Sequence, residues 1–432
     1  MKNTVKKIIV SILQFEARQV INKYKPKIIA VTGSVGKTST KDAIFSVLSP
    51  SRHIRKSEKS FNSEIGVPLT ILGCDNAWNN PIGWLSNIMH GLSLIISKNE
   101  YPDWLVLEVG ADRPGDIKSL TGWLKPDLTV VTRFGKTPVH VEYFKNREDL
   151  IQEKAYLVRA LRRDGKAILN YDDEDVRAFG EYTESSKIFY GFDGGVIKAS
   201  HYHVLTEQTG KGNFPAGIGF FVDYAGTPLA LELFGSLGKH HVYPALAALA
   251  VGYAQGLSPE EVQAGLRAHV PPLGRMHLID GIKGSLIIDD TYNASPVATI
   301  EALHTLQTLE KVTRKIAMLG DMMELGAHSS EAHREIGALA AHSCDILVAV
   351  GVRSRRIAEA AMDEGLSEKN VYQFDEAQEA GVFIQNLIME GDIILVKGSQ
   401  SIRMEQAVKE IMLEPEDAGK LLVRQDEEWS KR

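Results

Sequence analysis

The sequence predicts a two-domain α/β protein whose sheets are mostly parallel. A strand, a glycine turn and a helix follow one another in residues 28–49, later buried runs end in polar residues, and strands alternate with helices near the C-terminus. With 432 residues the chain is too long for one ordinary core. We therefore expect an N-terminal segment (residues 1–27), a central domain (28–270) and a C-terminal domain (271–432).

The composition is that of a globular protein, with 44% hydrophobic and 24% charged residues. A formal net charge of -6 gives no electrostatic reason to expect a nucleic-acid partner. Cys74 and Cys344 are the only cysteines, too few for a disulfide framework, which fits a reducing compartment. We expect a cytoplasmic protein that binds no nucleic acid.

Residues 32–40, TGSVGKTST, form the most informative stretch, between a buried strand run and apolar residues at helical spacing. The glycines let backbone N–H groups turn toward an anion, and the helix N-terminus adds partial positive charge. Lys37 would reach the outer phosphates and the Thr38 hydroxyl would bind Mg²⁺. An ordinary glycine turn is the less favoured alternative. The stretch predicts the phosphate loop of a P-loop-type ATPase domain, with the nucleotide bound by Gly33, Ser34, Gly36, Lys37, Thr38 and Ser39.

Two later strands also end in residues suited to a ligand site. WLVLE ends in Glu108, and the carboxyl ends of strands collect ligand chemistry in open α/β sheets. Glu108 is therefore placed to hold Mg²⁺, with a salt-bridged carboxylate as the alternative. His140 follows the strand at residues 128–132 and could bind a second metal ion. Lys154 lies in a helix at 150–161, where most lysines are solvated.

The remainder of the chain indicates two further parts. In residues 188–233, apolar and polar residues alternate and glycine is frequent, which suggests a small β region packed against the sheet. Prolines and a glycine at 271–276 mark the domain boundary. Beyond it, the buried strands SLIIDD, KIAMLGD, DILVAVG and DIILVKGS are separated by helical stretches. This pattern predicts a Rossmann-like C-terminal domain.

Two apolar segments raise the question of a membrane. Residues 1–27 start with basic residues and favour an amphipathic helix over a signal peptide. Residues 82–96 are apolar but too short and too interrupted to span a bilayer. Both segments could touch a membrane surface, although a core or partner-facing helix is the favoured interpretation of 82–96.

The motifs together resemble the Mur ligase family, ATP-dependent enzymes that join an amino acid or peptide to a carboxylate. They look most like the branch that adds D-alanyl-D-alanine to UDP-N-acetylmuramoyl-tripeptide in peptidoglycan precursor synthesis. The stretches that carry the resemblance are TGSVGKTSTK, NSEIGVPLTIL, LEVGADRPGDI, LNYDDEDV, GRM, IIDDTYNASP, KIAMLGDMMELG and LVKGSQSIRME.

The resemblance implies a mechanism and a set of roles. ATP phosphorylates the acceptor carboxylate, and the incoming amine attacks the acyl phosphate and expels phosphate. Lys37 and Thr38 would hold the phosphates and Mg²⁺, and Glu108 would bridge toward a second Mg²⁺ with His140. Lys154 matches the family's lysine that becomes carbamylated and then binds metal. From the second domain, the residues implied to line the nucleotide are Arg275, Asp290 and Asn293.

Members of this branch carry a UDP-sugar-binding domain before the phosphate loop, and we expect it to be lacking here. In its place are residues 1–27 and an apolar insertion at 73–103. We expect a monomer that acts on a nucleotide-sugar peptide or another small-molecule acceptor, with a dipeptide or amino acid as donor. A rival hypothesis is a Mur-type ligase for a different acceptor, such as a lipid-linked one. A non-catalytic nucleotide-binding regulator is a third hypothesis, against which the complete set of predicted metal and phosphate ligands argues.

Overall fold

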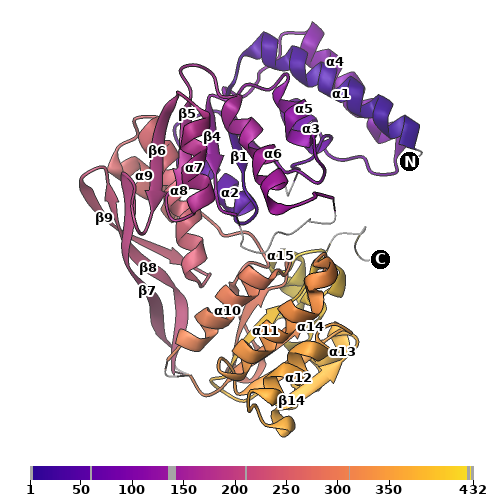
Figure 1. The fold of residues 1–432 in the computed structure, drawn as a ribbon, viewed down its shortest axis with the longest axis vertical. Coiled ribbons are helices and arrows are strands. Elements are labelled where there is room, and N and C mark those ends of the chain that lie inside the picture. The colour runs from indigo at the N-terminus through magenta and orange to yellow at the C-terminus, as the bar shows by residue number, and fades with distance from the viewer. Residues whose placement is uncertain are drawn as a thin grey trace.

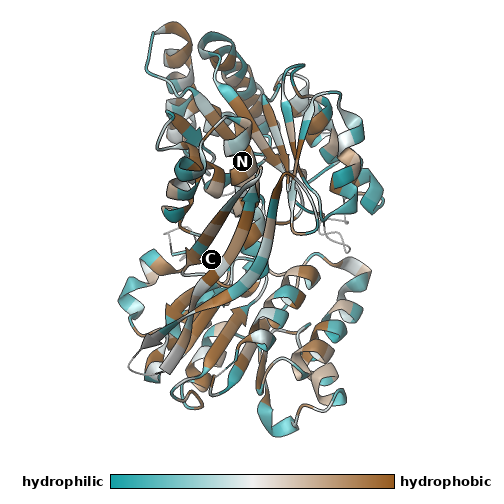
Figure 2. Cartoon of the chain, turned by 90° about the vertical axis from the view of Figure 1, so that its left-hand side faces the viewer, coloured by the Kyte–Doolittle hydropathy of each residue, from teal (hydrophilic) through white to brown (hydrophobic). Residues whose placement is uncertain are grey.

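The computed structural model describes residues 3–58, 61–134, 143–209, 212–310, 312–425 and 429. Figure 1 shows two α/β units stacked along the long axis of the molecule, with the N-terminal helix on the outer side of the first unit. In Figure 2, hydrophobic residues run along the strands, whereas the helices are striped with hydrophilic residues. This distribution is expected when helices cover sheets on one face and meet solvent on the other.

The first sheet joins nine strands of the described chain, and its parallel part begins at the edge strand β2 and ends at β7. Strands β7, β8 and β9 are antiparallel to one another and form the predicted small β region. In spatial order the strands are β2 (Ile54–Lys56), β3 (Trp104–Glu108), β1 (Lys27–Thr32), β4 (Leu128–Val131), β5 (Lys166–Asn170), β6 (Ser186–Gly191), β7 (Ile197–Thr209), β8 (Gly212–Tyr224) and β9 (Thr227–Phe234).

Helices cover both faces of this sheet. Successive side chains of β1 point to opposite faces, and those on both faces are apolar and buried. Ile29 and Val31 belong to the core shared with α2 and α8, whereas Ile28 and Ala30 face the core shared with α1 and α3. The helices of this unit are α1 (Asn3–Tyr24), α2 (Lys37–Leu48), α3 (Gly66–Leu72), α4 (Pro81–Ile96), α5 (Asp116–Thr121), α6 (Arg147–Arg159), α7 (Glu174–Ala178), α8 (Val242–Ala254) and α9 (Pro259–Arg267).

The second sheet has six described strands, all parallel except the edge strand β10. Its strands in spatial order are β10 (His277–Asp280), β11 (Leu286–Asp290), β15 (Ile393–Lys397), β12 (Lys315–Gly320), β13 (Ile346–Val350) and β14 (Val371–Phe374). Its helices are α10 (Pro296–Thr308), α11 (Ser329–Ala341), α12 (Arg355–Asp363), α13 (Ala377–Ile384), α14 (Glu405–Ile411) and α15 (Ala418–Leu421). The predicted α/β class and the Rossmann-like second unit are confirmed.

The two units are packed together through one continuous hydrophobic cluster. It includes Leu237 and Leu246 from the first unit and Ala294 and Leu303 from the second. The predicted boundary at 270/271 stays a prediction, and it falls in the segment between α9 and β10.

The N-terminal segment is helical, and α1 packs along α4 at the end of the molecule away from the second unit (Figure 1). Only Trp84, Gly91 and Leu94 of α4 are buried. Of the two forms of the favoured interpretation of residues 82–96, the core helix is wrong, because most of the apolar side chains of α4 stay exposed, and the partner-facing helix stays a prediction. Within the described residues, no helix is long and apolar enough to cross a lipid bilayer.

A carboxylate is buried between these two helices. Glu16 is 1% exposed, and neither carboxylate oxygen has a hydrogen-bond partner in the described structure. A Cβ atom at Gly91 would lie 2.3 Å from Glu16 Oε2, so the absence of a side chain at Gly91 makes room for the carboxylate. Burial raises the pKa of Glu16 to about 7.

Glu16→Gln is expected to stabilise the protein at alkaline pH. Since the folded-state pKa is raised from 4.5 to about 7, stability is greatest below the unfolded-state pKa and falls as the pH rises through the folded-state value. The variant should gain about 1–2 kcal/mol in free energy of unfolding at about pH 8, allowing for partial solvent screening, and much less at about pH 5. Denaturant melts at both pH values measure this, with Glu100→Gln at an exposed site as control. An equal gain in free energy of unfolding at both pH values would contradict a raised pKa of Glu16.

Candidate active site

The phosphate loop joins β1 to α2 through two glycines with positive φ, 141° at Gly33 and 83° at Gly36. A Cβ atom on Gly33 would lie 2.0 Å from Thr132 Oγ1, so this position cannot hold a side chain without a shift. Helix α2 begins at Lys37, and its N-cap residue supplies no side-chain hydrogen bond to the first turn. Its N-terminal amides are therefore suited to an anion.

The amides of the loop itself are used differently from the prediction. The backbone N–H groups of Ser34 and Val35 donate to Arg133 O, at 2.8 and 3.2 Å, and so tie the loop to the end of β4. The predicted contact of Ser34 with the nucleotide would therefore have to come from its side chain. The amides at the start of α2 remain the main candidates for phosphate binding.

Glu108, at the end of β3, lies beside the start of α2. Its carboxylate is 1% exposed and accepts hydrogen bonds from Thr38 Oγ1 at 2.9 Å and Asn62 Nδ2 at 3.0 Å. The parallel register pairs Val31 with Glu108, which brings the end of β3 to the phosphate loop. Asn62 entered the sequence analysis only as part of the stretch NSEIGVPLTIL, and its contact with Glu108 was missed, because that contact depends on tertiary structure.

Two lysines converge on the loop from different helices. Lys154 of α6 is 3% exposed, and its Nζ donates to Gly33 O at 3.0 Å. Burial, and then the charge of Lys37, hold the pKa of Lys154 well below its usual value. Burial also lowers the pKa of Lys37, against the opposing attraction of Glu108. The positive charge of Lys37 thus disfavours a charged Lys154, and the charge of Arg275 further lowers the pKa of Lys37. A bound polyphosphate would supply negative charge to these cations.

The predicted metal ligands are brought together only in part. Thr38, Glu108 and Lys154 surround the loop, whereas His140 lies outside the described residues. The described residues hold no cluster of three or more His, Cys, Asp or Glu side chains suited to a metal ion. The metal site therefore remains a prediction.

The second unit faces the loop across a cleft of about 1150 Å³. Thr38 lines it from α2, and the opposite lining includes Arg275, Tyr292, Arg424 and Trp429. The Arg275 guanidinium lies 4.3 Å from the centre of the Tyr292 ring. Sequence reasoning identified Arg275 but missed the other three, since it attached no chemistry to aromatic residues or to the segment after residue 405.

Asp290 and Asn293 do not line this cleft and instead contact the buried Lys397. The Lys397 ammonium donates to Asp290 Oδ2 at 2.6 Å and to Asn293 O at 3.1 Å. Asn293 lines a neighbouring cavity of about 460 Å³ together with Ser399 and Arg403. Asp290 thus orients Lys397 in the structure, and its predicted contact with the nucleotide remains a prediction.

Lys397→Met should destabilise the second unit, because it leaves the Asp290 carboxylate without its buried partner. The Lys397 and Asp290 side chains are only 3% and 11% exposed. Losing one partner of such a pair lowers the free energy of unfolding by about 3–5 kcal/mol. The double variant Lys397→Met/Asp290→Asn should recover part of that loss in denaturant melts. A single variant as stable as the wild type would contradict the inferred pairing.

The surrounding charge also favours an anion. His240 is half-buried, its buried Nδ1 has no hydrogen-bond partner in the described structure, and its pKa is lowered to about 3. Burial is the main cause, followed by the positive charges of Lys397, Arg275 and Arg133. The ring is therefore neutral. Lys397 and Arg133 are ion-paired with Asp290 and Glu301. Of these three cations, Arg275 lines the cleft and would attract an anion there.

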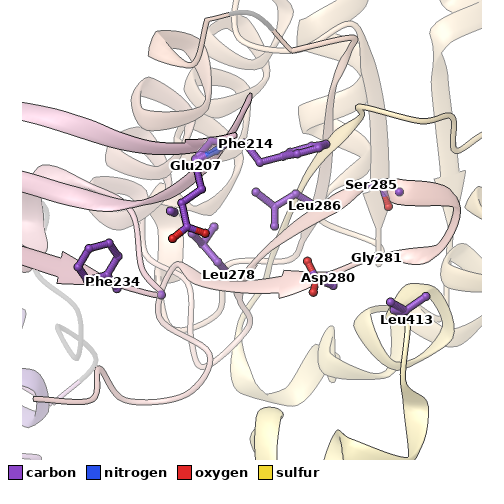
Figure 3. A pocket seen from close by; sticks show the side chains of 13 residues that line it. Glu207, Phe214, Phe234, Leu278, Asp280, Gly281, Ser285, Leu286 and Leu413 are labelled. Carbon is purple, nitrogen blue, oxygen red and sulfur yellow. The ribbon is translucent and has the colours of Figure 1, made fainter. Parts of the chain in front are cut away.

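A separate cavity of about 570 Å³ lies between the β7–β8 ribbon and the start of the second sheet. Figure 3 shows the Glu207 and Asp280 carboxylates on its wall with the apolar side chains of Phe214, Leu278 and Leu286. None of the predicted site residues lines it. Its carboxylates would repel phosphate, so it is not the nucleotide site.

An uncapped helix N-terminus, two lysines at the phosphate loop and a facing Rossmann-like unit define a nucleotide-binding P-loop enzyme of two domains. Comparison with known families agrees: residues 31–252 match the Mur ligase middle domain, and residues 274–400 match the domain described as "Mur ligase, glutamate ligase domain". The chain belongs to the Mur ligase family, whose members are ATP-dependent ligases.

Individual relatives cover most of the chain. The UDP-N-acetylmuramoyl-tripeptide--D-alanyl-D-alanine ligase of Bacillus subtilis (strain 168) is 28% identical, over 93% of this chain and 79% of its own. The crystal structure of MurF from Acinetobacter baumannii has a TM-score of 0.74 and 27% identity, covering 93% of this chain and 79% of that one. MurF ligase from Thermotoga maritima, solved in complex with ADP, has the same fold, with a TM-score of 0.75 at 24% identity, covering 93% and 83%.

Proposed function

We propose that this protein is an ATP- and Mg²⁺-dependent ligase that joins D-alanyl-D-alanine to the peptide carboxylate of UDP-N-acetylmuramoyl-tripeptide. The observation that carries the proposal is the phosphate loop with Lys37, Lys154 and the Thr38–Glu108 pair, which faces Arg275 across one cleft. The substrates are those of the relatives named above. We also propose that it works in the cytoplasm as a monomer.

The chain's own residues would act by positioning and by neutralising charge. The amides at the start of α2 and the Lys37 ammonium would hold the ATP phosphates, and Arg275 would add positive charge from the other side of the cleft. The γ-phosphoryl group passes to the acceptor carboxylate, which becomes an acyl phosphate. The donor amine then forms the amide bond, the C–O bond to phosphate breaks, and inorganic phosphate leaves.

The donors beside the loop fit Mg²⁺, which prefers oxygen ligands. Thr38 Oγ1 and the Glu108 carboxylate lie 2.9 Å apart at the start of α2, where they would hold the ion against the phosphates. Bound Mg²⁺ would supply charge neutralisation for the transferred phosphoryl group. A carbamate on Lys154 would add a further carboxylate to this donor set, and His140 is the remaining predicted ligand.

A second candidate is the same chemistry on a lipid-linked acceptor. The exposed apolar side chains of α4 favour it, because they would bring the enzyme into peripheral contact with a membrane. The acceptor, and not the reaction, distinguishes the two candidates.

The proposal is tested by product mass. Purified protein is incubated with ATP, Mg²⁺, UDP-N-acetylmuramoyl-tripeptide and D-alanyl-D-alanine, and we expect a UDP-linked pentapeptide and one phosphate per product. If no product forms while ATP still binds, this acceptor is wrong and the lipid-linked candidate is favoured. If ATP binds but no acceptor supports phosphate release, the ligase assignment fails in favour of a nucleotide-binding regulator.

A further inference from the structure

Helix α4 presents an apolar surface that the described structure leaves uncovered. Its sequence, PIGWLSNIMHGLSLII, contains no charged residue. Five side chains spaced alternately three and four residues apart are 37–80% exposed, and they form what we call the α4 stripe: Ile82, Leu85, Met89, Leu92 and Ile96. This spacing places them along one side of the helix.

Helix α1 packs against the other side of α4 and has exposed apolar residues of its own. Its exposed Ile8 and Phe15 are seven residues apart, two helical turns along one face. Lys23 of α1 connects the two helices by hydrogen bonds. Its ammonium donates to Leu94 O at 2.8 Å and to Ile95 O at 2.9 Å, near the end of α4. The pair therefore forms one structural element.

The charges on this element are of one sign. Lys7 and Arg18 are exposed on α1, whereas its single acidic residue, Glu16, is buried. The chain as a whole has a formal net charge of -6, so the positive charge of this apolar surface differs in sign from the charge of the whole chain. Apolar side chains next to Lys and Arg are the pattern of helices that lie in the interface of an anionic membrane.

We propose that the α1–α4 surface binds an anionic lipid bilayer, with α4 lying in the plane of the interface. A helix of 16 residues is about 24 Å long. This suits a helix lying flat, because a helix needs about 20 apolar residues to span the hydrocarbon core. The α4 stripe would enter the acyl boundary, and Lys7 and Arg18 would meet the headgroups.

A second copy of the chain fits this surface less well. A two-fold interface places the same patch of both copies in contact, so Lys7 and Arg18 would meet α1 and α4 helices that offer no exposed acidic residue. The residues flanking the α4 stripe, Ser86, Asn87 and Ser93, also lack the charges that set helix pairing.

Vesicle cosedimentation of the full chain tests the proposal. We expect binding to phosphatidylcholine–phosphatidylglycerol vesicles, weaker binding to phosphatidylcholine alone, and loss of binding at high salt. Leu85→Gln/Met89→Gln should lower the affinity about tenfold or more, because two apolar anchors are removed. Lys7→Glu/Arg18→Glu should abolish the preference for anionic vesicles. The assay needs neither ATP nor acceptor, so its outcome is independent of the proposed ligation.

The matched control is Val270→Gln/Val352→Gln, at sites 73% and 70% exposed elsewhere on the molecule. It should bind vesicles as the wild type does, and circular dichroism melts should show that all variants are folded. The proposal is overturned if the wild type does not bind anionic vesicles, or if the control loses binding equally. It is also overturned if sedimentation velocity shows a dimer that Leu85→Gln/Met89→Gln dissociates while vesicles bind neither protein.

Discussion

Lys37→Ala is expected to reduce the ligation rate by about 10²–10³-fold, since it removes a preorganised positive charge from the site of phosphoryl transfer. Lys37 is the first residue of α2, so its charge adds to that of the helix N-terminus. Because burial already lowers the pKa of Lys37, its ammonium is poorly solvated in the free enzyme. Bound polyphosphate would restore favourable interactions to it, which ties ATP binding to catalysis.

The measurement is kcat and KM for ATP, with Lys187→Ala in the exposed part of β6 as control. Lys187→Ala should behave as the wild type does. The folded stability of Lys37→Ala should be equal or higher, because a desolvated cation is removed. A Lys37→Ala enzyme within about twofold of wild-type kcat/KM would show that α2 is not the phosphate site.

Lys154→Gln is expected to reduce the ligation rate by a similar factor, but for a different chemical reason. The depressed pKa of Lys154 favours the neutral amine, the form that can attack carbon dioxide. The nitrogen forms a bond to the carbon of CO₂ and loses a proton, which gives an N-carboxylated lysine with one negative charge. That anion would lie next to the positive charge of Lys37 and stabilise it.

Labelled bicarbonate tests this assignment. The wild type in ¹³C-bicarbonate should give a carbamate carbon signal that Lys154→Gln lacks, and activity should fall when bicarbonate is removed. Lys125→Gln, whose Nζ donates to Thr121 O, is the control and should keep both signal and activity. Full activity of Lys154→Gln would remove Lys154 from the mechanism.

Much of the fold could be predicted because its signals are local. Buried runs such as residues 28–31 and 393–396 lie in central parallel strands, where both faces are covered and apolar residues are required throughout. Gly33 and Gly36 were identified for the same reason, since positive φ favours glycine whatever the surroundings.

The contacts that the sequence could not predict join residues far apart in the chain. The bonds of Glu108 to Thr38 and Asn62 depend on the strand order β3–β1, and the Lys397–Asp290 pair depends on β15 lying beside β11. Whether α4 is a core helix or an exposed one could not be decided from the sequence for a related reason. An apolar helix with no charge looks the same in sequence whether its outer side is buried or open.

The central claim is ligation through an acyl phosphate, and isotope transfer tests it most directly. The acceptor UDP-N-acetylmuramoyl-tripeptide is prepared with ¹⁸O in its reacting carboxylate and incubated with ATP, Mg²⁺ and D-alanyl-D-alanine. The account predicts that each released phosphate carries one ¹⁸O atom, because the acceptor oxygen bridges to phosphorus and leaves with it. Product formed with unlabelled phosphate, or with the label in AMP, would contradict the account.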